Sequence, residues 1–395
     1  MIEKRSDWQE RLSPGVNAIA PSGIRKFFDI AAQMEDVISL GVGEPDFVTP
    51  WSIRESCVYG LEQGYTSYTA NRGMPELRQE IARHYQENYG TSYDWDTDIL
   101  VTVGVSEALD IAMRAILSPG DEVLIPEPCY VSYQACTILA GGVPVAVPAK
   151  QENAFRITAA ELEEHVTEKT KALLIGYPNN PTGAIMTKKD LLAVADFAEK
   201  HDLIVISDEI YGDLTYGDEE HICFSSLPGM QERTILLNGF SKAYAMTGWR
   251  IGYAMANKAI VAAMTKIHQY TMLCAPITAQ IAAIEALRHG EKYMKKMVAE
   301  YDRRRRLIYD GFIKMGLECF EPKGAFYIFP SIKSTGYTSD EFAEKLLQAE
   351  HVALVPGSAF GACGEGHVRC SYATSIDKIS EALNRIENFL RNHRK

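Results

Sequence analysis

Short, nearly continuous apolar segments alternate with helical patterns from residue 98 onward. Such runs are typical of strands buried on both faces, in a mostly parallel sheet that helices cover on either side. The expected strands are 99–103, 122–125, 143–147, 172–175, 204–207, 234–237 and 251–255. Helical periodicity falls between them, over 105–117, 130–140, 159–166, 187–200 and 257–272. The sequence therefore predicts an α/β fold whose large domain has a mostly parallel seven-stranded sheet between helices.

The two ends of the chain predict a second, smaller α/β domain. A long charged helix is expected over 293–315, followed by strands at 325–329, 353–355 and 367–372 and helices at 339–349 and 376–392. Before the sheet, helices are expected over 23–34, 51–63 and 75–89. We expect residues 1–48 to form an N-terminal arm and part of the small domain, 49–289 the large domain, and 290–395 the C-terminal small domain.

Composition excludes several function classes. The formal net charge of −12 over 395 residues argues against a nucleic-acid partner. No segment is apolar for long enough to span a membrane, and the polar N-terminus carries no secretory signal. The eight cysteines are scattered, without a CxxC motif or a metal-like pairing with histidine, so we expect free thiols in a reducing cytoplasm and no metal site. The basic cluster at 303–306 indicates a solvated helix face or an interface, with a binding patch as the alternative.

Lys242 lies in the stretch that carries the strongest chemical signal. Small residues surround it, and apolar runs at 234–237 and 251–255 place it on a loop between two buried strands. Burial disfavours the charged ammonium form, and a neutral amine is what a Schiff base with an aldehyde requires. Arg250 follows eight residues later and offers a fixed positive fork suited to a phosphate. A surface lysine beside a structural arginine is the alternative for this pair alone.

Other chemically suited side chains follow the ends of the expected strands, where ligands bind on such sheets. The turn at 103–107 opens a helix, whose free amides favour an anion. Tyr130 offers a ring that can stack on a planar ligand, and Asn180 lies in a loop fixed by prolines and glycine. Asp208 ends an apolar strand, where a carboxylate needs a cationic partner. Arg369 lies within a strand of the small domain and suits a grip on a carboxylate.

Taken together, the motifs resemble the class I/II aminotransferases, which are pyridoxal-phosphate enzymes of the aspartate aminotransferase fold (fold type I). The likeness covers nearly the whole chain. The matching motifs are Gly-Glu-Pro-Asp-Phe (43–47), Ser-Tyr-Thr (67–69), Asn-Asn-Pro-Thr-Gly (179–183), Ser-Asp-Glu-Ile-Tyr (207–211), Ser-Lys-Ala-Tyr-Ala-Met-Thr-Gly-Trp-Arg (241–250) and Val-Arg-Cys-Ser-Tyr (368–372). Pyridoxal 5′-phosphate is therefore the implied cofactor.

The resemblance implies a role for each residue around the cofactor ring. Lys242 is similar to the lysine that forms the Schiff base and later carries the proton between the substrate Cα and the cofactor C4′. Asp208 is similar to the partner of the pyridine nitrogen. Tyr211 and Asn180 are similar to the groups that bond the phenolic oxygen O3′, and Tyr130 to the stacking aromatic.

The resemblance also implies a phosphate site and a substrate site. Arg250 and the backbone at Val105 and Ser106 would hold the phosphate, and Tyr68 would reach it from a neighbouring subunit of a homodimer. The family often has a phosphate-binding serine three residues before the lysine; here that residue is Gly239, and Ser241 is a candidate replacement. Arg369, Asn180 and the Gly43 backbone would hold the substrate α-carboxylate.

The implied reaction is a ping-pong exchange of an amino group between an L-amino acid and a 2-oxo acid. Some aspartate aminotransferases hold the distal carboxylate with a lysine where this chain has Ser106 and a threonine near the position of Ile24. Arg25, Arg72 and the stretch 268–270 are possible substitutes, although a structural role is favoured for each.

The pattern at 21–28, 268–270 and 324–334 is most similar to Bacillus-type alanine aminotransferases. We therefore expect alanine as the donor, with glutamate and 2-oxoglutarate as the partner pair. Aspartate, aromatic and acetyl-diaminopimelate aminotransferases are the alternatives within the family. Two other classes stay open: a carbon–sulfur β-lyase that uses the same lysine, and a non-catalytic regulator that binds the cofactor.

Overall fold

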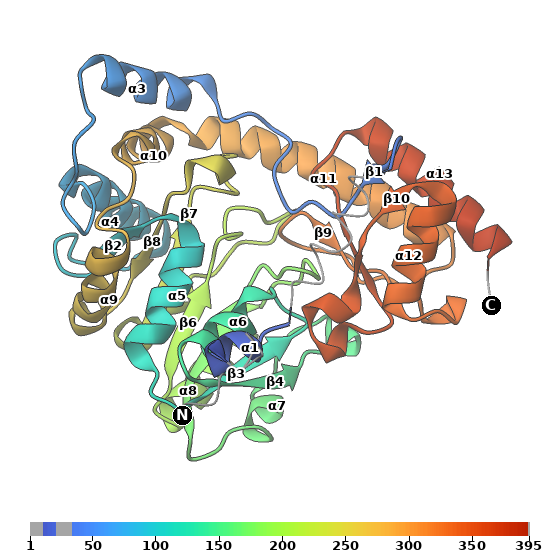
Figure 1. Cartoon of the computed structure of the whole chain (residues 1–395), viewed down its shortest axis with the longest axis horizontal. Helices are drawn as coiled ribbons and strands as arrows, with labels where there is room; N and C mark the ends of the chain where they lie inside the picture. Colours follow the sequence, from blue (N-terminus) through green and yellow to red (C-terminus); the bar gives the residue numbers. More distant parts are fainter. Residues whose placement is uncertain (1–10, 21–33, 394–395) are drawn as a thin grey trace, which may run out of the picture.

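A computed structural model describes residues 11–20 and 34–393 (Figure 1). Its central sheet has seven strands in the order β2-β8-β7-β6-β5-β3-β4. Only β8 runs opposite to the other six strands, so the predicted mostly parallel sheet is confirmed. The strands are β2 (Ile99–Thr102), β3 (Glu122–Glu127), β4 (Val143–Pro148), β5 (Thr170–Gly176), β6 (Ile204–Asp208), β7 (Thr234–Gly239) and β8 (Gly252–Met255).

Consecutive residues of the central strands enter different parts of the core. In β5, Leu173 and Ile175 pack in one hydrophobic cluster, whereas Leu174 between them packs in another. Because side chains alternate across a strand, a strand covered on both faces must be apolar at every position. This alternation explains why the strands appear in the sequence as continuous apolar runs.

Helices cover both faces of the sheet (Figure 1). α5 packs against α6 and α9, α7 packs against α8, and α10 packs against α3 and α4. Capping boxes at Thr158 and Thr187 start α7 and α8. The helices are α1 (Pro14–Asn17), α3 (Trp51–Glu62), α4 (Pro75–Tyr89), α5 (Gly104–Ile116), α6 (Ser132–Leu139), α7 (Ala159–Glu163), α8 (Lys188–Lys200), α9 (Lys258–Thr271) and α10 (Ile277–His289).

The C-terminal part of the chain forms a smaller α/β unit, reached through the long helix α11 (Glu291–Lys314) (Figure 1). β11, β12 and β9 form an antiparallel sheet, and the early strand β1 pairs in parallel with β10. These elements are β1 (Ile38–Ser39), β9 (Tyr327–Ile328), α12 (Ser339–Glu350), β10 (Val352–Ala353), β11 (Val355–Pro356), β12 (Val368–Ser371) and α13 (Ile376–Asn392). The domain boundaries at 48/49 and 289/290 stay predictions, and most of the helix expected over 23–34 lies outside the described residues.

The basic cluster at 303–306 on α11 is only half solvated, which corrects the interpretation made from the sequence. Arg303 and Arg306 are exposed, but Arg304 and Arg305 are buried. Arg304 forms ion pairs with Asp46 and Glu300, and Arg305 with Asp302 and Glu321. Two of these partners, Asp46 and Glu321, lie outside α11, so the inner arginines attach the helix to its surroundings.

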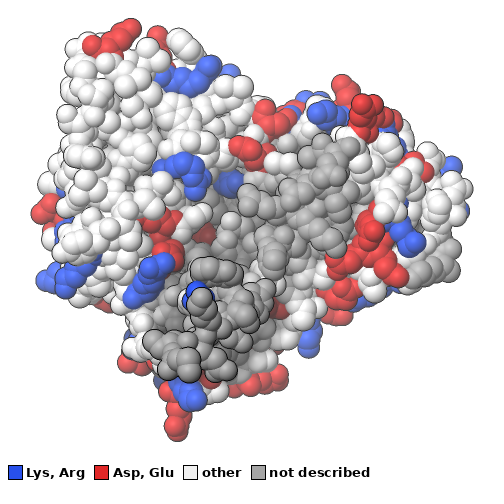
Figure 2. Space-filling model, in the orientation of Figure 1, with Lys and Arg blue, Asp and Glu red and all other residues white. Residues whose placement is uncertain are grey.

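Charged side chains of both signs are interspersed over the described surface in Figure 2. In the part of the chain that the structure describes, no helix is long and apolar enough to cross a membrane.

Candidate active site

Eleven of the twelve site residues predicted from the sequence line one cavity of about 1290 Å³. The cavity lies where the carboxyl ends of the parallel strands meet, and β12 contributes Arg369 from the smaller unit. The eleven residues are Gly43, Val105, Ser106, Tyr130, Asn180, Asp208, Tyr211, Ser241, Lys242, Arg250 and Arg369. Tyr68 does not line this cavity: 83% of it is exposed on the surface.

Lys242 follows β7 and reaches into the cavity. Its Nζ donates a hydrogen bond to the backbone oxygen of Gly43 (2.7 Å) and lies 5.8 Å from the Tyr211 ring centroid. Burial and, to a smaller extent, the positive charges of Arg369 and Arg250 lower the pKa of Lys242 to about 8, against an opposing effect of Glu44. A larger fraction of this amine is therefore neutral at physiological pH than in an exposed lysine, as a nucleophilic amine requires.

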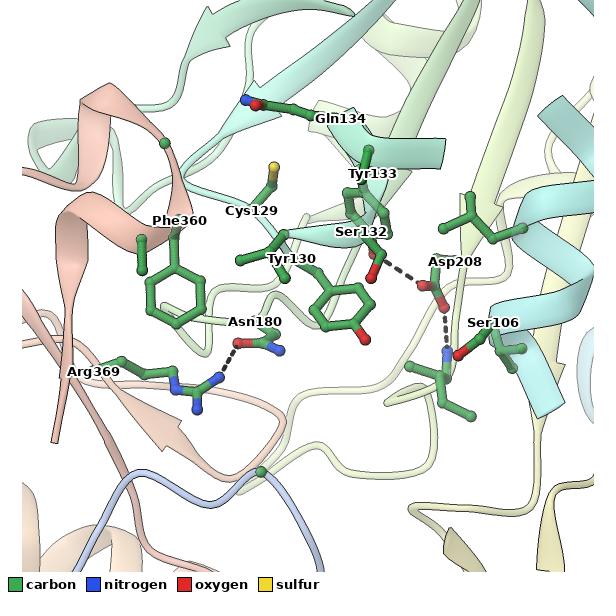
Figure 3. A pocket seen from close by; sticks show the side chains of 18 of the residues that line it. Ser106, Cys129, Tyr130, Ser132, Tyr133, Gln134, Asn180, Asp208, Phe360 and Arg369 are labelled. Atoms are coloured by element: carbon green, nitrogen blue, oxygen red, sulfur yellow. Dashed lines mark hydrogen bonds between the residues drawn. The ribbon is translucent and has the colours of Figure 1, made fainter. Parts of the chain in front are cut away.

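Asp208 is the last residue of β6 and is buried. Its Oδ2 accepts a hydrogen bond from the Tyr133 hydroxyl (2.9 Å), and its Oδ1 accepts one from the Ile210 N–H (3.2 Å) (Figure 3). Burial raises the pKa of Asp208 to about 6, although both hydrogen bonds favour the carboxylate. Among the described residues no cation is ion-paired with it, so the carboxylate fits a ligand that carries a buried positive proton donor, such as a pyridinium nitrogen.

Tyr133 is a site residue that the sequence reasoning missed. It lies in the first turn of α6, three residues after Tyr130, and its ring meets the Tyr130 ring edge-on at 5.7 Å. In Figure 3, Tyr130 lies between Asp208 on one side and the Asn180–Arg369 pair on the other. Tyr130 precedes α6 and Tyr133 lies inside it, so the only signal in the sequence is that the two aromatic residues are three positions apart at a strand end.

The N-terminus of α5 and Arg250 form a compact anion cradle. Gly104 opens the helix with a φ of +73°, and a Cβ placed there would lie 2.9 Å from the guanidinium Nη2 of Arg250. Glu107 fixes the turn because its Oε2 accepts a hydrogen bond from the Val103 N–H and its Oε1 is 2.5 Å from Nδ1 of His268. His268 is fully buried in this contact, which agrees with the favoured structural role.

Gly239, where the resemblance would lead one to expect a serine, lies opposite Gly252 in the β7–β8 pair. A Cβ at Gly239 would lie 2.9 Å from the Gly252 Cα and 3.0 Å from the Ile251 oxygen. A Cβ at Gly252 would lie 2.8 Å from the Val105 nitrogen. The cradle is thus packed directly on strand backbone, and a side chain at position 239 has no room unless the strands move apart. Ser241 is buried and lines the cavity.

Arg369 presents a buried guanidinium to the cavity from β12. Its Nη1 donates to Asn180 Oδ1 (2.9 Å) and its Nη2 to the Gly41 oxygen (2.5 Å), whereas its Nε is buried without a partner. Burial lowers the pKa of Arg369, and no described carboxylate is paired with it. An arginine with a spare buried donor suits an anionic ligand group. Arg72 does not line this cavity and donates to the Asp96 backbone instead, and Arg25 lies outside the described residues.

The raised pKa of Asp208 predicts a pH-dependent gain in stability for Asp208→Asn in the cofactor-free protein. Because the folded-state pKa (about 6) exceeds the unfolded value, burial of the carboxylate costs nothing at low pH and its full amount above pH 6. The substitution removes the cost of burying the charge but also loses one hydrogen bond. The net effect that we expect for Asp208→Asn is a stabilisation of about 1–2 kcal/mol near about pH 8 and little change near about pH 4.5. Melting temperatures at the two pH values measure this difference.

Asp202→Asn is the matched control, because the Asp202 side chain is 96% exposed. An equal effect of Asp208→Asn at both pH values would contradict the assigned cost of burying its charge.

Comparison with known proteins gives the same family as the motifs. Residues 35–386 match the family model for aminotransferase class I and II. YugH of Bacillus subtilis (strain 168), which is named as an aminotransferase, is 57% identical, with 96% of this chain and 98% of that protein covered. An aspartate aminotransferase of Pyrococcus abyssi is 51% identical over 96% and 98% of the two chains.

A solved structure of an aromatic aminotransferase from Pyrococcus horikoshii OT3 superimposes with a TM-score of 0.89 at 48% identity, covering 93% of this chain and 98% of that one. Enzymes of this family are transaminases that use pyridoxal phosphate. The cavity fits that cofactor, because a lysine of lowered pKa, an unpaired buried carboxylate and an anion cradle line the same space. The chain belongs to the class I and II aminotransferases and is a pyridoxal-phosphate-dependent transaminase.

Proposed function

We propose that this aminotransferase exchanges amino groups in a ping-pong reaction, with L-alanine as the favoured donor and glutamate and 2-oxoglutarate as the partner pair. The observation that carries the proposal is the position of Lys242. Its amine, with a pKa of about 8, lines the same cavity as an unpaired buried carboxylate, Asp208, and an unpaired buried guanidinium, Arg369. Bound pyridoxal phosphate supplies an electrophilic carbon and an electron-withdrawing ring that stabilises negative charge on the substrate Cα.

The residues around the ring would each hold one part of it. Asp208 holds the proton on the pyridine nitrogen, which keeps the ring electron-withdrawing. Tyr211 and Asn180 bond the O3′ oxygen, and Tyr130 stacks on the ring face. Lys242 would supply the amine that holds the cofactor covalently, and the same amine would move the proton at the substrate Cα.

The two ends of the bound molecules would be held by separate groups. Arg250, the backbone at Val105 and Ser106, and the Ser241 hydroxyl hold the phosphate, where the α5 N-terminus adds its partial positive charge. Arg369, Asn180 and the Gly43 backbone hold the substrate α-carboxylate. The phosphate and the carboxylate therefore bind to different arginines on different structural units.

The described lining of the cavity supports a small neutral side chain on the donor. The only cations in that lining are Lys242, Arg250 and Arg369, and each already has a role. Ser106 stands where some aspartate aminotransferases carry a lysine, so no described cation remains for a distal carboxylate. Gln134 and Ser358 also line the cavity, but the Ser358 hydroxyl donates to Asp340 (2.7 Å) and the Gln134 amide donates to Glu127, so of these two side chains only the second amide hydrogen of Gln134 remains for the far end of 2-oxoglutarate. Aspartate and aromatic donors are the second candidates, because relatives of 48–51% identity are named for them.

The surface around Tyr68 supports a homodimer in which each cavity is completed by a second copy of the chain. Asn71, next to the Tyr68 loop, donates to the Leu273 oxygen (2.7 Å), which brings this loop beside the end of α9. Large exposed apolar patches mark interfaces. The exposed side chains on α3, this loop and α9 include Trp51, Tyr59, Tyr65, Tyr68 and Tyr270.

The eight cysteines are all unpaired, which supports the proposed cytoplasmic location.

The first test of the function is the absorbance spectrum of the protein loaded with pyridoxal phosphate while single amino acids are added without an oxo acid. We expect alanine and glutamate to remove the visible band, because Lys242 is displaced and the amino group stays on the cofactor. Lys242→Ala should abolish the borohydride-reducible covalent adduct, measured by mass spectrometry. A band removed by aspartate or phenylalanine but not alanine would overturn the donor, and pyruvate released only from sulfur-bearing amino acids would indicate a β-lyase.

The packing of the anion cradle predicts that Gly252→Ala weakens cofactor binding. The new Cβ would lie 2.8 Å from the Val105 nitrogen and 2.9 Å from the Gly104 carbonyl carbon, so the phosphate-binding amides must move. We expect the Kd for pyridoxal phosphate to rise about tenfold or more, which matches the usual cost of overpacking. Gly248→Ala is the control, since a Cβ there has nothing within 4 Å. An unchanged Kd in Gly252→Ala would refute the cradle.

A hybrid dimer tests whether Tyr68 acts on the partner's cavity. Tyr68→Ala should weaken cofactor binding in the homodimer, and Lys242→Ala should remove the covalent adduct. A dimer with one chain of each variant then contains one cavity that has both an intact Lys242 and an intact Tyr68 from the other chain. We expect that cavity to recover wild-type affinity, measured by titration of the purified hybrid. Affinity that stays at the Tyr68→Ala level would show that Tyr68 acts within its own chain or not at all.

A further inference from the structure

Tyr327 lines the active-site cavity but matches none of the roles assigned above. It lies on the short strand β9 and is 1% exposed. Its hydroxyl oxygen lies 2.7 Å from the hydroxyl oxygen of Tyr211. The Arg369 guanidinium carbon lies 4.5 Å from the centre of its ring. A single tyrosine from the smaller unit thus contacts the proposed O3′ partner and the proposed carboxylate-binding arginine.

The backbone at Gly43 passes close to the same Tyr327 hydroxyl. A Cβ placed at Gly43 would lie 2.4 Å from the Tyr327 hydroxyl oxygen, so only glycine allows the 41–43 backbone to pass this close. The Gly43 oxygen accepts from Lys242, and the neighbouring Gly41 oxygen accepts from Arg369. The Tyr327 hydroxyl is therefore enclosed by Tyr211 on one side and by the substrate-binding backbone on the other.

The direction of the hydrogen bond between the Tyr211 and Tyr327 hydroxyls decides which of the two can donate to a third group. Each phenol has one proton to donate. If Tyr211 donates to Tyr327, it has no proton left for another acceptor. If Tyr327 donates to Tyr211, the Tyr211 proton is free to point into the cavity. Hydrogen bonds in such a chain also strengthen one another, because a hydroxyl that accepts becomes a better donor.

We propose that Tyr327 is a positioning residue that donates to Tyr211 and thereby fixes the Tyr211 hydroxyl as a donor to the cofactor O3′ oxygen. The proposal rests on the O3′ role proposed for Tyr211. Tyr327 acts on the cofactor through Tyr211, and its ring supports Arg369 independently of its hydroxyl. The hydroxyl and the ring therefore serve two functions that substitutions can separate.

The test is a pH titration of the visible absorbance band of the protein loaded with pyridoxal phosphate. A donor to O3′ stabilises negative charge on that oxygen, so its removal raises the apparent pKa of the band. We expect Tyr211→Phe to raise that pKa by about 1 unit and Tyr327→Phe to raise it by about 0.3–0.5 unit. The double variant should match Tyr211→Phe, because Tyr327 has no other route to the cofactor.

The outcomes separate this inference from the proposed function. No shift in Tyr211→Phe would overturn the O3′ role of Tyr211 and this inference with it. A shift in Tyr211→Phe together with a wild-type pKa in Tyr327→Phe would overturn the inference alone. Additive shifts in the double variant would also overturn it, because Tyr327 would then act independently of Tyr211. Tyr372→Phe is the control, since it removes a buried hydroxyl that donates to the Ala325 oxygen (3.2 Å).

Kinetics give a second readout that a merely structural role would not produce. Tyr327→Phe keeps the ring against Arg369, so we expect kcat to fall while the KM for the amino acid stays within about twofold. Tyr327→Leu also removes the ring, and we expect the KM to rise as well. An unchanged kcat in Tyr327→Phe, or a KM that rises equally in both variants, would contradict the separation of hydroxyl and ring. Melting temperatures of all variants identify any loss of folding.

Discussion

Three charged groups line one cavity of this protein without pairing with one another: the carboxylate of Asp208, the amine of Lys242 and the guanidinium of Arg369. Among the described residues no ion pair involves any of the three. Neutral groups support them instead, since Asp208 accepts from Tyr133, Lys242 donates to the Gly43 backbone, and Arg369 donates to Asn180 and the Gly41 backbone. Burial without a counter-charge shifts the pKa of each group toward its neutral form. The site therefore holds electrostatic free energy that a ligand of complementary charge releases, and pyridoxal phosphate with an amino acid has such charges at the ring nitrogen and the α-carboxylate.

The fold makes this arrangement possible because the charges come from chain segments that are far apart in the sequence. The carboxyl ends of the parallel strands bring Asp208, Lys242 and the α5 N-terminus to one edge of the sheet, where side chains leave the apolar interior. Arg369 comes from the antiparallel sheet of the smaller unit, and β9 of that sheet contributes Tyr327. The proposed phosphate site thus belongs to the large sheet and the proposed carboxylate site to the small one. Relative positions of the two sheets set the distance between the two anions that the enzyme has to hold.

Much of this organisation could be predicted from the sequence, because strands buried on both faces give continuous apolar runs and the chemical groups follow the strand ends as short motifs. The groups that were missed have no such pattern. Tyr133 and Tyr327 look like core aromatics, and their roles depend on hydroxyl partners 75 and 116 residues away. The same limit applies to Arg304, whose charge is typical of a solvated helix face although its partner Asp46 lies 258 residues away in the sequence. The antiparallel direction of β8 could not be predicted either, because a strand that helices cover on both faces is equally apolar in either direction.

Gly239 shows how a missing functional group can follow from packing. The glycine faces Gly252 across the β7–β8 pair, and Gly252 in turn lies against the Val105 nitrogen and the Gly104 carbonyl carbon of the anion cradle. A hydroxyl at position 239 would add one donor but would separate the strands that hold the backbone donors in place. Backbone amides at a helix N-terminus are fixed by the fold and lose no side-chain entropy when they bind an anion. Close packing of the two glycines therefore keeps the strand backbone against the α5 N-terminus, and Ser241 lines the cavity beside Lys242 as the nearby hydroxyl.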